Sequence, residues 1–270
     1  MNKSDGRHAD QPDGSYADKK AFFERVLTVY GRKPALEALS DDSLDCHRLH
    51  LAQSNRSGGI IEQLLSTAQA RGVPVSYHAR EALARISKNG KQDQGVALDI
   101  LCPAFRQLDD YLAALPSLPR QRILALDGIT NPQNLGMILR SAAAGEIDAV
   151  LWSRRGNAAL GPLVIKASSG TLYRAPLVFC QNLPEALAAC RAAGIEVLTL
   201  RADAGRNLFG YRPATHAIYV LGNETSGVSK EVAAQADAGL AIPMGRGVES
   251  LNVAVTAALI AYAETAAGGQ

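Results

Sequence analysis

Apolar residues gather along the chain in short runs that alternate with stretches of helical periodicity. After residue 121, the runs suited to strands cover residues 123–126, 149–152, 177–179, 196–200, 217–221 and 239–242. Helical patterns lie between most of them. Strands that alternate with helices predict a parallel sheet covered by helices on both faces. We therefore expect an α/β domain over residues 121–270.

A smaller domain is predicted in front of it. Residues 23–103 alternate between short helices and strands, which is typical of a small mixed α/β domain. The helices are expected at residues 33–39, 60–70 and 79–87, and the strands at residues 47–52, 73–78 and 96–101. Residues 104–120 contain two prolines and are interpreted as a linker. Residues 1–22 are polar and are interpreted as a disordered tail.

The most apolar helix is expected near the end of the chain, within the segment from Ile242 to Ala263. A glycine-rich turn leads to Ser250, which is the expected N-cap because its side chain can bond free backbone N–H groups. Nearly every face of the following helix is apolar, which predicts a buried helix. Asn252 is the exception. Two interpretations of this amide are open, a capping residue or part of a ligand site.

The carboxyl ends of parallel strands are where ligands bind in such sheets. The turns after Leu126, Leu200, Leu221 and Ile242 are therefore the candidates for chemistry. Each of these turns carries polar residues that a buried strand would not tolerate, and these residues are the candidate functional side chains.

The turn after Leu126 leads into a helix with Asn134 as the expected N-cap and Gly145 as the expected end. Arg140 is the only charged residue of this helix and points away from its apolar face. An arginine near a helix N-terminus, at the active edge of a sheet, is a candidate anion-binding residue. A solvated surface side chain is the alternative.

The turn after Leu221 excludes two nucleotide-binding classes. Gly222 and Gly227 have the spacing of a phosphate loop, but Val228 stands where that loop needs lysine. No G-x-G-x-x-G follows a strand, which counts against a dehydrogenase. Glu224 is the one carboxylate of this turn. Three roles are open for it: a surface acid, a helix-start residue, or a partner for an arginine.

Charge distribution is more informative than net charge. The chain of 270 residues has a net charge of +2, which does not indicate a nucleic-acid partner. Residues 149–184, however, contain no acid, and a local basic face can bind phosphates. The basic residues of this segment are Arg154, Arg155, Lys166 and Arg174. A solvated basic surface is the alternative.

Cysteine and histidine usage indicates neither a disulfide framework nor a metal. The four cysteines are scattered without a C-x-x-C pair, so a reducing cytoplasm is the expected location. His47 and His50 are close in sequence, but no further ligand accompanies them, and we predict no metal site. No apolar run reaches the roughly 18 residues of a membrane span, so no membrane partner is expected.

Three segments at the candidate edge resemble the motifs of one enzyme family. The segments are "NPQNLGMILRSA" (131–142), "LGNETSGVS" (221–229) and "IPMGRGVESLNVAV" (242–255). In order and spacing they are similar to the three motifs of the SpoU-type (TrmH-like) RNA 2′-O-ribose methyltransferases, part of the knotted SPOUT class. "YGRKPALEAL" (30–39) and "QGVAL" (94–98) resemble parts of the small RNA-binding domain that many members carry.

The resemblance implies a trefoil-knotted catalytic domain, S-adenosylmethionine as cofactor, and rRNA or tRNA as substrate. The implied catalytic residues are Asn134, Arg140, Glu224, Ser250 and Asn252. The implied cofactor-binding residues are Thr199, Leu200, Leu221, Gly222, Ile242, Met244, Leu251 and Asn252. Ser168 and Ser169 are implied RNA contacts beside the basic residues. Asp93 departs from a histidine common in the small domain, which bears on RNA contacts and not on catalysis.

The chemistry of ribose methylation is consistent with these residues. The hydroxyl must lie in line with the methyl donor, and positioning alone supplies several kcal/mol. A guanidinium is essentially never deprotonated, so Arg140 is not expected to be a simple base. We expect it to hold the substrate phosphate and to stabilise the developing alkoxide. Glu224 is expected to orient Arg140 through a bidentate pair.

A homodimer is expected because the sheet can cover only one side of the apolar last helix. The resemblance implies that the two subunits share the catalytic site. The two-domain layout favours rRNA over tRNA by analogy alone. The alternative function is a catalytically inactive RNA-binding protein that retains the fold, although Asn134, Arg140 and Asn252 are all present.

Overall fold

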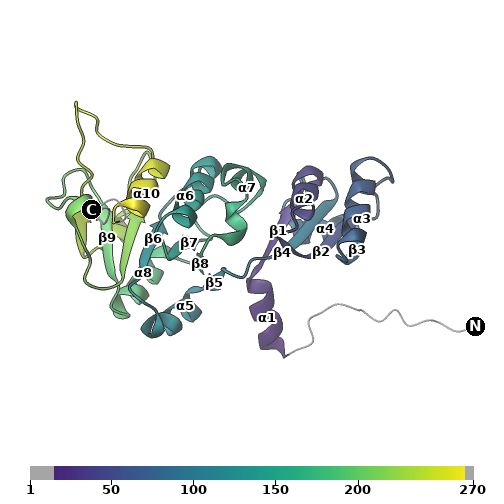
Figure 1. Cartoon of the computed structure of the whole chain (residues 1–270), viewed down its shortest axis with the longest axis horizontal. Helices are drawn as coiled ribbons and strands as arrows, with labels where there is room; N and C mark the ends of the chain where they lie inside the picture. The colour runs from purple at the N-terminus through teal and green to yellow at the C-terminus, as the bar shows by residue number, and fades with distance from the viewer. Residues whose placement is uncertain (1–14, 265–270) are drawn as a thin grey trace, which may run out of the picture.

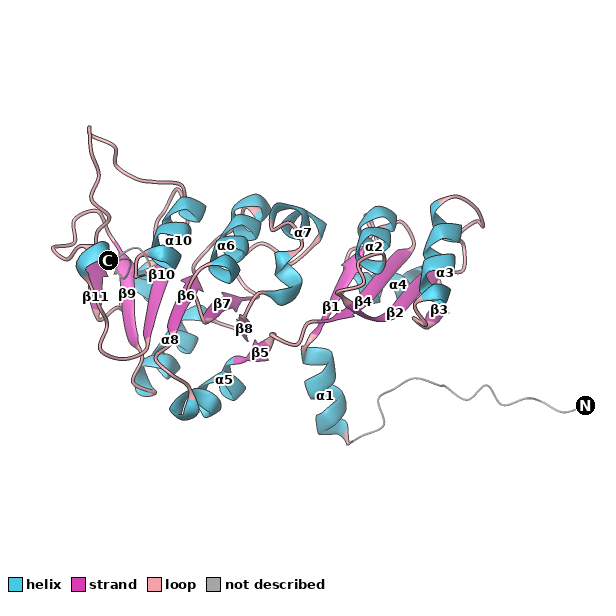
Figure 2. Ribbon diagram, in the orientation of Figure 1, coloured by secondary structure: helices cyan, strands magenta, loops and turns pink. Residues whose placement is uncertain are grey.

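The computed structural model describes residues 15–264 as two lobes that lie side by side (Figure 1). The smaller lobe is built on a four-stranded sheet and the larger lobe on a seven-stranded sheet, with helices packed on both (Figure 2). The α/β fold class expected from the sequence is confirmed. Residues 1–14 of the expected tail, and residues 265–270 of the expected catalytic domain, lie outside the described residues.

The smaller sheet has the strand order β1-β4-β2-β3. Its elements are β1 (Val26–Tyr30), α2 (Arg32–Leu39), β2 (Asp45–Ala52), α3 (Ile60–Ala70), β3 (Val75–His78), α4 (Arg80–Ser87) and β4 (Val96–Leu101). β1 and β2 pair antiparallel with β4, and β3 pairs parallel with β2. The sequence pattern does not predict β1. It is an edge strand in which only Leu27 and Val29 are buried, so its apolar signal is short.

The larger sheet has the order β11-β9-β10-β6-β7-β8-β5, and all its pairs are parallel. Its strands are β5 (Arg106–Gln107), β6 (Arg122–Leu126), β7 (Ala149–Ser153), β8 (Leu177–Cys180), β9 (Glu196–Leu200), β10 (Ala217–Leu221) and β11 (Ala238–Leu240). Its helices are α5 (Leu108–Ala114), α6 (Pro132–Ala144), α7 (Pro162–Ala167), α8 (Leu183–Ala192), α9 (Lys230–Ala233) and α10 (Val253–Tyr262). The predicted parallel sheet is thus confirmed.

Two separate groups of side chains cover the two faces of this sheet. Leu124 and Leu126 of β6 belong to the core shared with α6 and α10, whereas Ile123 and Ala125 pack with α8. Successive side chains of a strand point to opposite faces, so each buried strand serves both cores. Figure 1 shows α6, α7 and α10 on one face of the sheet and α5 and α8 on the other.

Two segments have more regular structure than the sequence indicates. Helix α1 (Tyr16–Glu24) overlaps the expected tail, and Ser15 and Asp18 form a capping box at its start. In the expected linker 104–120, β5 adds an edge strand to β8, and α5 follows it. Tyr111 and Leu115 of this segment are buried in the core with α8. Residues 106–115 are therefore part of the larger lobe. The sequence pattern does not predict this, because a strand of two residues is too short to give an apolar pattern.

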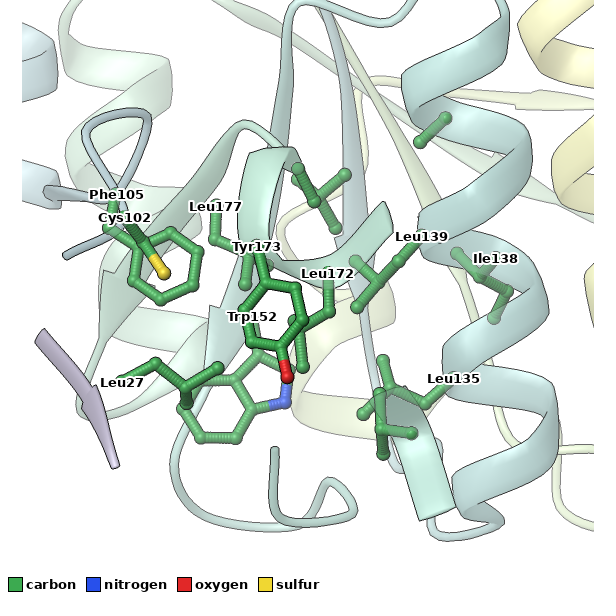
Figure 3. Packing of buried hydrophobic residues seen from close by; sticks show 14 of the residues in the cluster. Leu27, Cys102, Phe105, Leu135, Ile138, Leu139, Trp152, Leu172, Tyr173 and Leu177 are labelled. Atoms are coloured by element: carbon green, nitrogen blue, oxygen red, sulfur yellow. The ribbon is translucent and has the colours of Figure 1, made fainter. Parts of the chain in front are cut away.

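One apolar core runs through both lobes. Leu27 of β1 lies in the same buried cluster as Phe105 and Trp152. The rings of Phe105 and Trp152 meet the Phe179 ring edge to face, with centroids 5.1 Å and 5.6 Å from it. Figure 3 shows Leu27 beside Phe105 and Trp152, with Tyr173 close by. The lobes therefore share buried apolar contacts instead of being joined by the chain alone.

A buried arginine anchors the end of the last helix. The side chain of Arg122, at the start of β6, is 5% exposed and donates to the carbonyls of Ile260 and Ala261 in the last turn of α10. Its Nε lies 3.2 Å from Glu264 Oε1, an ion pair without hydrogen-bond alignment. The carbonyls at a helix end lack intrahelical partners, so Arg122 satisfies groups that would otherwise be buried and unpaired.

We predict that Arg122→Ala lowers the free energy of unfolding by about 3–5 kcal/mol, because it leaves the buried carbonyls at the end of α10 without a donor and removes one of the two arginines that pair with Glu264. Chemical denaturation measures this change. Arg191→Ala is the matched control, since Arg191 pairs with Asp237 at the surface and a surface pair contributes about 0–1 kcal/mol. Equal losses for the two variants would contradict an anchoring role for Arg122.

Candidate active site

Four strands of the larger sheet end at one edge. Leu221, at the end of β10, lies beside Leu126 of β6, and Leu240 of β11 lies beside Leu200 of β9. Because these strands are parallel and adjacent, the loops that follow them leave from the same edge. The fold therefore brings together the predicted candidate turns, although they are up to about half the chain apart in sequence.

Three polar side chains meet at this edge, one from each candidate segment. Asn134 Nδ2 donates a hydrogen bond to Glu224 Oε1. Asn252 Nδ2 donates to Asn134 Oδ1 over 3.2 Å. Asn134 is buried, at 5% exposure, and a buried amide needs hydrogen-bond partners. We call these three residues the amide cluster, and it joins the first, second and third candidate segments.

The helix starts differ from those predicted. α6 begins after Asn131, whose side chain caps the first turn, and Pro132 occupies its first position. The prediction of Asn134 as N-cap is therefore wrong. α10 begins after Asn252, whose Oδ1 accepts backbone N–H bonds from the first turn. The prediction of Ser250 as N-cap is also wrong, because this exposed residue lies in the preceding loop.

The structure confirms the capping interpretation of Asn252 and adds a contact with Asn134. Its oxygen caps α10, and its amide nitrogen reaches Asn134. One side chain thus fixes the start of the last helix and the position of a buried polar group on another helix. The α6 helix carries Asn134 in its first turn, so the two helix starts are held against each other.

The residues expected to hold a cofactor surround the same edge. Thr199 and Leu221 are buried within the sheet, and Leu200 and Ile242 are half-buried. Met244 and Leu251 are each 37% exposed, on the long loop between β11 and α10. Gly222 begins the loop after β10. A Cβ there would lie 2.3 Å from the carbonyl carbon of Gly227, so this turn requires glycine.

The rim of this edge has backbone donors that the protein does not use. Within residues 15–264, no acceptor bonds the backbone N–H of Ile242 or Leu251. Ile242 lies between Ala241 and Pro243, with Met244 next along the chain, whereas Leu251 lies between Ser250 and Asn252. An apolar surface with free backbone groups suits a flat, uncharged ring with polar edges, such as adenine. The residues present therefore fit an adenosine-containing cofactor.

The second candidate loop is held by residues that the sequence analysis missed. Asn223 Nδ2 donates to the carbonyl of Gly128, and its Oδ1 accepts from the backbone N–H of Thr225. Asp127 Oδ2 accepts from the backbone N–H of Ser229 at 2.7 Å. Asn and Asp are common in turns because they bond nearby backbone, and this signal in "DG" and "GNE" could have identified both.

Arg140 lies apart from the amide cluster. It is six residues after Asn134 on α6, about 9 Å along the helix axis at 1.5 Å per residue. Its Nη1 donates to Ser169 Oγ at 3.0 Å. The Glu224 carboxylate bonds Asn134, so the predicted Arg140–Glu224 pair is not formed within the described residues of one chain.

Most of the predicted RNA-binding side chains are exposed. Arg155, Lys166 and Ser169 are exposed, and so is Arg154, whose guanidinium lies 5.8 Å from the Phe179 ring centroid. Arg174 is exposed and donates to Ser43 of the smaller lobe.

Ser168 is an exception among these predictions. It is fully buried, and its hydroxyl bonds the Ile165 carbonyl at 2.9 Å and the Leu172 backbone N–H at 3.2 Å. It therefore holds the turn after α7 and cannot contact RNA. A hydroxyl that bonds local backbone has no sequence signal to distinguish it from its exposed neighbour, Ser169.

The histidines and cysteines considered in the sequence analysis lie outside the candidate active site. His50 bonds Asp99 and His78, each at 3.0 Å, across the smaller sheet. Among residues 15–264, no group of three or more His, Cys, Asp or Glu is placed to hold a metal ion. The four cysteines are free, and burial raises the pKa of Cys180 and Cys190 to about 12, so both thiols are protonated at neutral pH. No helix of the described chain is long and apolar enough to cross a membrane.

The sequence profile of the SpoU rRNA Methylase family matches residues 121–262, which is just over half of the chain. A second profile, for RNA 2′-O ribose methyltransferase substrate binding, matches residues 28–101. The chain belongs to the SpoU methyltransferase family. The predicted resemblance is confirmed, and the amide cluster lies within the first of these two regions.

Relatives and solved structures support the same placement. A relative from Mycolicibacterium vanbaalenii, named an uncharacterized tRNA/rRNA methyltransferase, is 33% identical over 86% of this chain and 74% of its own length. A Porphyromonas gingivalis structure, a putative RNA methyltransferase of the TrmH family, is 28% identical with a TM-score of 0.58 and 91% coverage of each chain. The SpoU methyltransferase AviRb from Streptomyces viridochromogenes shares the fold, with 23% identity, a TM-score of 0.61, and 95% and 96% coverage of the two chains.

We predict that the two roles of Asn252 can be separated by substitution. Asn252→Ala should lower the free energy of unfolding by about 1 kcal/mol through loss of the cap, whereas serine also caps and Asn252→Ser should cost less, about 0.5 kcal/mol. Both variants should lose methyl-transfer activity of this SpoU protein, because neither side chain reaches Asn134. Chemical denaturation and a methyl-transfer assay measure the two effects.

Asn182→Ala is the control for this prediction, because Asn182 caps α8, away from the amide cluster. It should lower stability like Asn252→Ala and leave methyl transfer intact. Full activity of Asn252→Ser would show that the contact with Asn134 is unimportant.

Proposed function

We propose that this protein transfers a methyl group from S-adenosylmethionine to a ribose 2′-hydroxyl of RNA, in rRNA or tRNA, with rRNA favoured. The observation that carries the proposal is the amide cluster beside the free N–H groups of Ile242 and Leu251. The names of SpoU structures from Streptomyces viridochromogenes and Sinorhizobium meliloti state that AdoMet is bound in them. The match of the smaller lobe to a substrate-binding family supports RNA as the substrate.

Bound S-adenosylmethionine would supply an electrophilic methyl group next to the sheet edge. The backbone N–H groups of Ile242 and Leu251 would bind it, with Met244 as part of the apolar surface. The amide cluster would keep the surrounding loops in a fixed geometry, and fixed positioning of the reactants can supply several kcal/mol of the barrier. The loops after β9, β10 and β11 would form the proposed trefoil knot around it.

Arg140 is proposed to act on the substrate. Its guanidinium is exposed and keeps donors beyond the one used for Ser169. It would hold a phosphate of the RNA and stabilise the alkoxide that develops on the 2′-oxygen. The hydroxyl proton would leave through that phosphate or through water. We assign no base role to Arg140, because guanidinium stays protonated.

The separation of Arg140 from the amide cluster supports a site shared between two subunits. In one chain, these groups lie on different faces of α6. Helix α10 has an outer apolar face formed by Val255, Leu259 and Tyr262 at helical spacing, and Leu251 of the preceding loop extends it. Val255 and Tyr262 are 48% and 44% exposed. We propose that a two-fold pairing of these faces forms a homodimer and brings Arg140 of each subunit to the cofactor of its partner.

The inner face of α10 is not available for that pairing. It packs against α6 of the same chain, and a Cβ on Gly145 would lie 2.7 Å from Ala261 Cβ. The small residues at the end of α6 therefore allow close approach of two helices within one chain. The dimer proposal rests on the outer face alone.

The alternative of a catalytically inactive RNA-binding protein has less support. Loss of Asn134, Arg140 or Asn252 would favour it, and all three residues are present. A cytoplasmic location is proposed because four free cysteines suit a reducing compartment.

The direct test of the proposed methyltransferase function is a map of 2′-O-methyl sites in rRNA and tRNA from a deletion strain. The proposal requires at least one site to disappear and to return when the gene is restored.

We predict that Arg140→Ala lowers the single-turnover rate of methyl transfer by about 10²-fold or more, as loss of an alkoxide-stabilising group does. Binding of S-adenosylmethionine, measured by calorimetry, should stay within about twofold because Arg140 lies away from the cofactor edge. Arg140→Lys should not restore the rate, since an ammonium cannot reproduce the guanidinium fork. Arg191→Ala serves as a control, and a rate for Arg140→Ala within a few-fold of it would exclude this role.

We also predict that Val255→Glu converts the dimer to a monomer at micromolar concentration, because each interface would bury two unpaired carboxylates. Sedimentation equilibrium on the full chain measures the mass. Gln69→Glu, on the exposed face of α3, is the charge-matched control and should remain dimeric. A monomeric wild-type protein would refute the dimer without bearing on the cofactor.

A further inference from the structure

A cleft lies between the two lobes, where α2 of the smaller lobe faces α7 of the larger one (Figure 1). It consists of two adjoining cavities of about 870 Å³ and 430 Å³. Lys33 and Pro34 from α2, and Pro162 and Leu163 from α7, line both cavities, so the two are continuous. The larger cavity is within the size range of a pocket for an organic ligand of one or two rings with their substituents.

Positive charge lines the larger cavity. Of the described residues that line it, none is acidic, while Arg32 and Lys33 contribute two cations. Arg32 is fixed in place by bonds from Nε to the Gln94 carbonyl and from Nη2 to Asn55 Oδ1, each at 3.2 Å. Lys33 is exposed and lines both cavities. The acids of the cleft, Glu37 and Asp41, line the smaller cavity only, so the acid-free wall of the larger cavity is the part that attracts phosphate.

Polar and apolar groups alternate on the remaining wall. Gln92 and Gln94 are exposed. Their side-chain oxygens accept from Asn89 Nδ2 and from the Arg32 backbone N–H, each at 3.1 Å, and their amide NH2 groups remain able to donate. Leu163 is 63% exposed, one of the most exposed large apolar side chains of the larger lobe, and Pro162 lies next to it. Apolar surface next to amides can pack against the face of a base while the amides bond its edge.

The two ends of the cleft reach the candidate active site. The larger cavity extends to Thr130 and Pro132, at the start of α6 and two residues from Asn134. The smaller cavity extends to Ser169, whose hydroxyl bonds Arg140. A ligand in the cleft would therefore lie beside the start of α6 and, through Ser169, next to Arg140.

We propose that this cleft binds an unpaired nucleotide of the RNA substrate next to the methylated residue, with Lys33 on its phosphate and Leu163 against its base. The inference rests on the proposed function, since it takes RNA as the substrate. A single strand is favoured over a duplex because an unstacked base can enter a cavity and expose its edge to amides. Lys33 and Leu163 are then residues that determine which RNA sequence is methylated.

The test uses the full-length protein and two labelled probes, a short single-stranded RNA of mixed sequence and an RNA duplex of the same length. Lys33→Ala should weaken binding to the single strand and lower the slope of log K against log salt by about 1, for one lost phosphate contact. Leu163→Ala should weaken binding roughly tenfold with the slope unchanged, because an apolar contact releases no counterions. Both side chains are exposed, so neither change threatens the fold.

Arg85→Ala is the control, since Arg85 is an exposed cation of the same lobe on α4, outside the cleft. It should keep the affinity and the slope of the wild-type protein. With an RNA that the protein methylates, Lys33→Ala and Leu163→Ala should raise KM more than they lower kcat, as loss of uniform binding does. Behaviour of both variants like Arg85→Ala would overturn the proposal, and so would equal weakening for the duplex.

Failure of the cleft and failure of the proposed function give different results. A wild-type protein that methylates RNA, with Lys33 and Leu163 variants that bind normally, refutes the cleft alone. A wild-type protein that methylates no RNA, with a lowered salt slope for Lys33→Ala, refutes the proposed function and supports the cleft as an RNA site.

Discussion

The hydrogen-bonding requirement of one buried amide, Asn134, determines how the catalytic lobe is put together. An amide out of water must have both its donor and its acceptor satisfied. In this protein the two partners come from distant segments, Glu224 at a separation of 90 residues and Asn252 at a separation of 118. Neither contact forms unless the strands before those loops are already paired in the right order. The amide cluster therefore forms only when β6, β10 and β11 are in their native order. A sheet with these strands in another order would leave Asn134 without its hydrogen-bond partners.

The last helix explains why polar contacts are needed at both of its ends. α10 is rich in alanine and apolar on most of its surface, so a shift along its axis would cost little in burial. Asn252 fixes its first turn through the cap, and Arg122 fixes its last turn through the carbonyls of Ile260 and Ala261. Polar bonds are directional where apolar packing is not. The register of the helix therefore follows from its two ends, and the loop before it is placed at the sheet edge as a result.

Much of this fold follows from the sequence, because buried parallel strands are continuous apolar runs between helical patterns. The strands around residues 123–126, 196–200 and 217–221 were predictable in that way. The edge strands β1 and β5 were not, since an edge strand is half-buried and β5 has only two residues. The three candidate segments were identified from their positions after strands and from family resemblance. Their contacts were not predictable. Glu224 bonds Asn134 instead of Arg140, and this depends on distances that no local sequence pattern contains.

The shared core between the lobes has a consequence for how a substrate is selected. Leu27, Phe105 and Trp152 join the smaller lobe to the larger sheet through buried contacts, and side chains in a packed core cannot slide without opening a void. The angle between the lobes is therefore set when the chain folds. A rigid pair of surfaces accepts only ligands whose two contact points have the matching separation and direction, so part of the discrimination among RNAs would be made by their three-dimensional shape before any base is inspected.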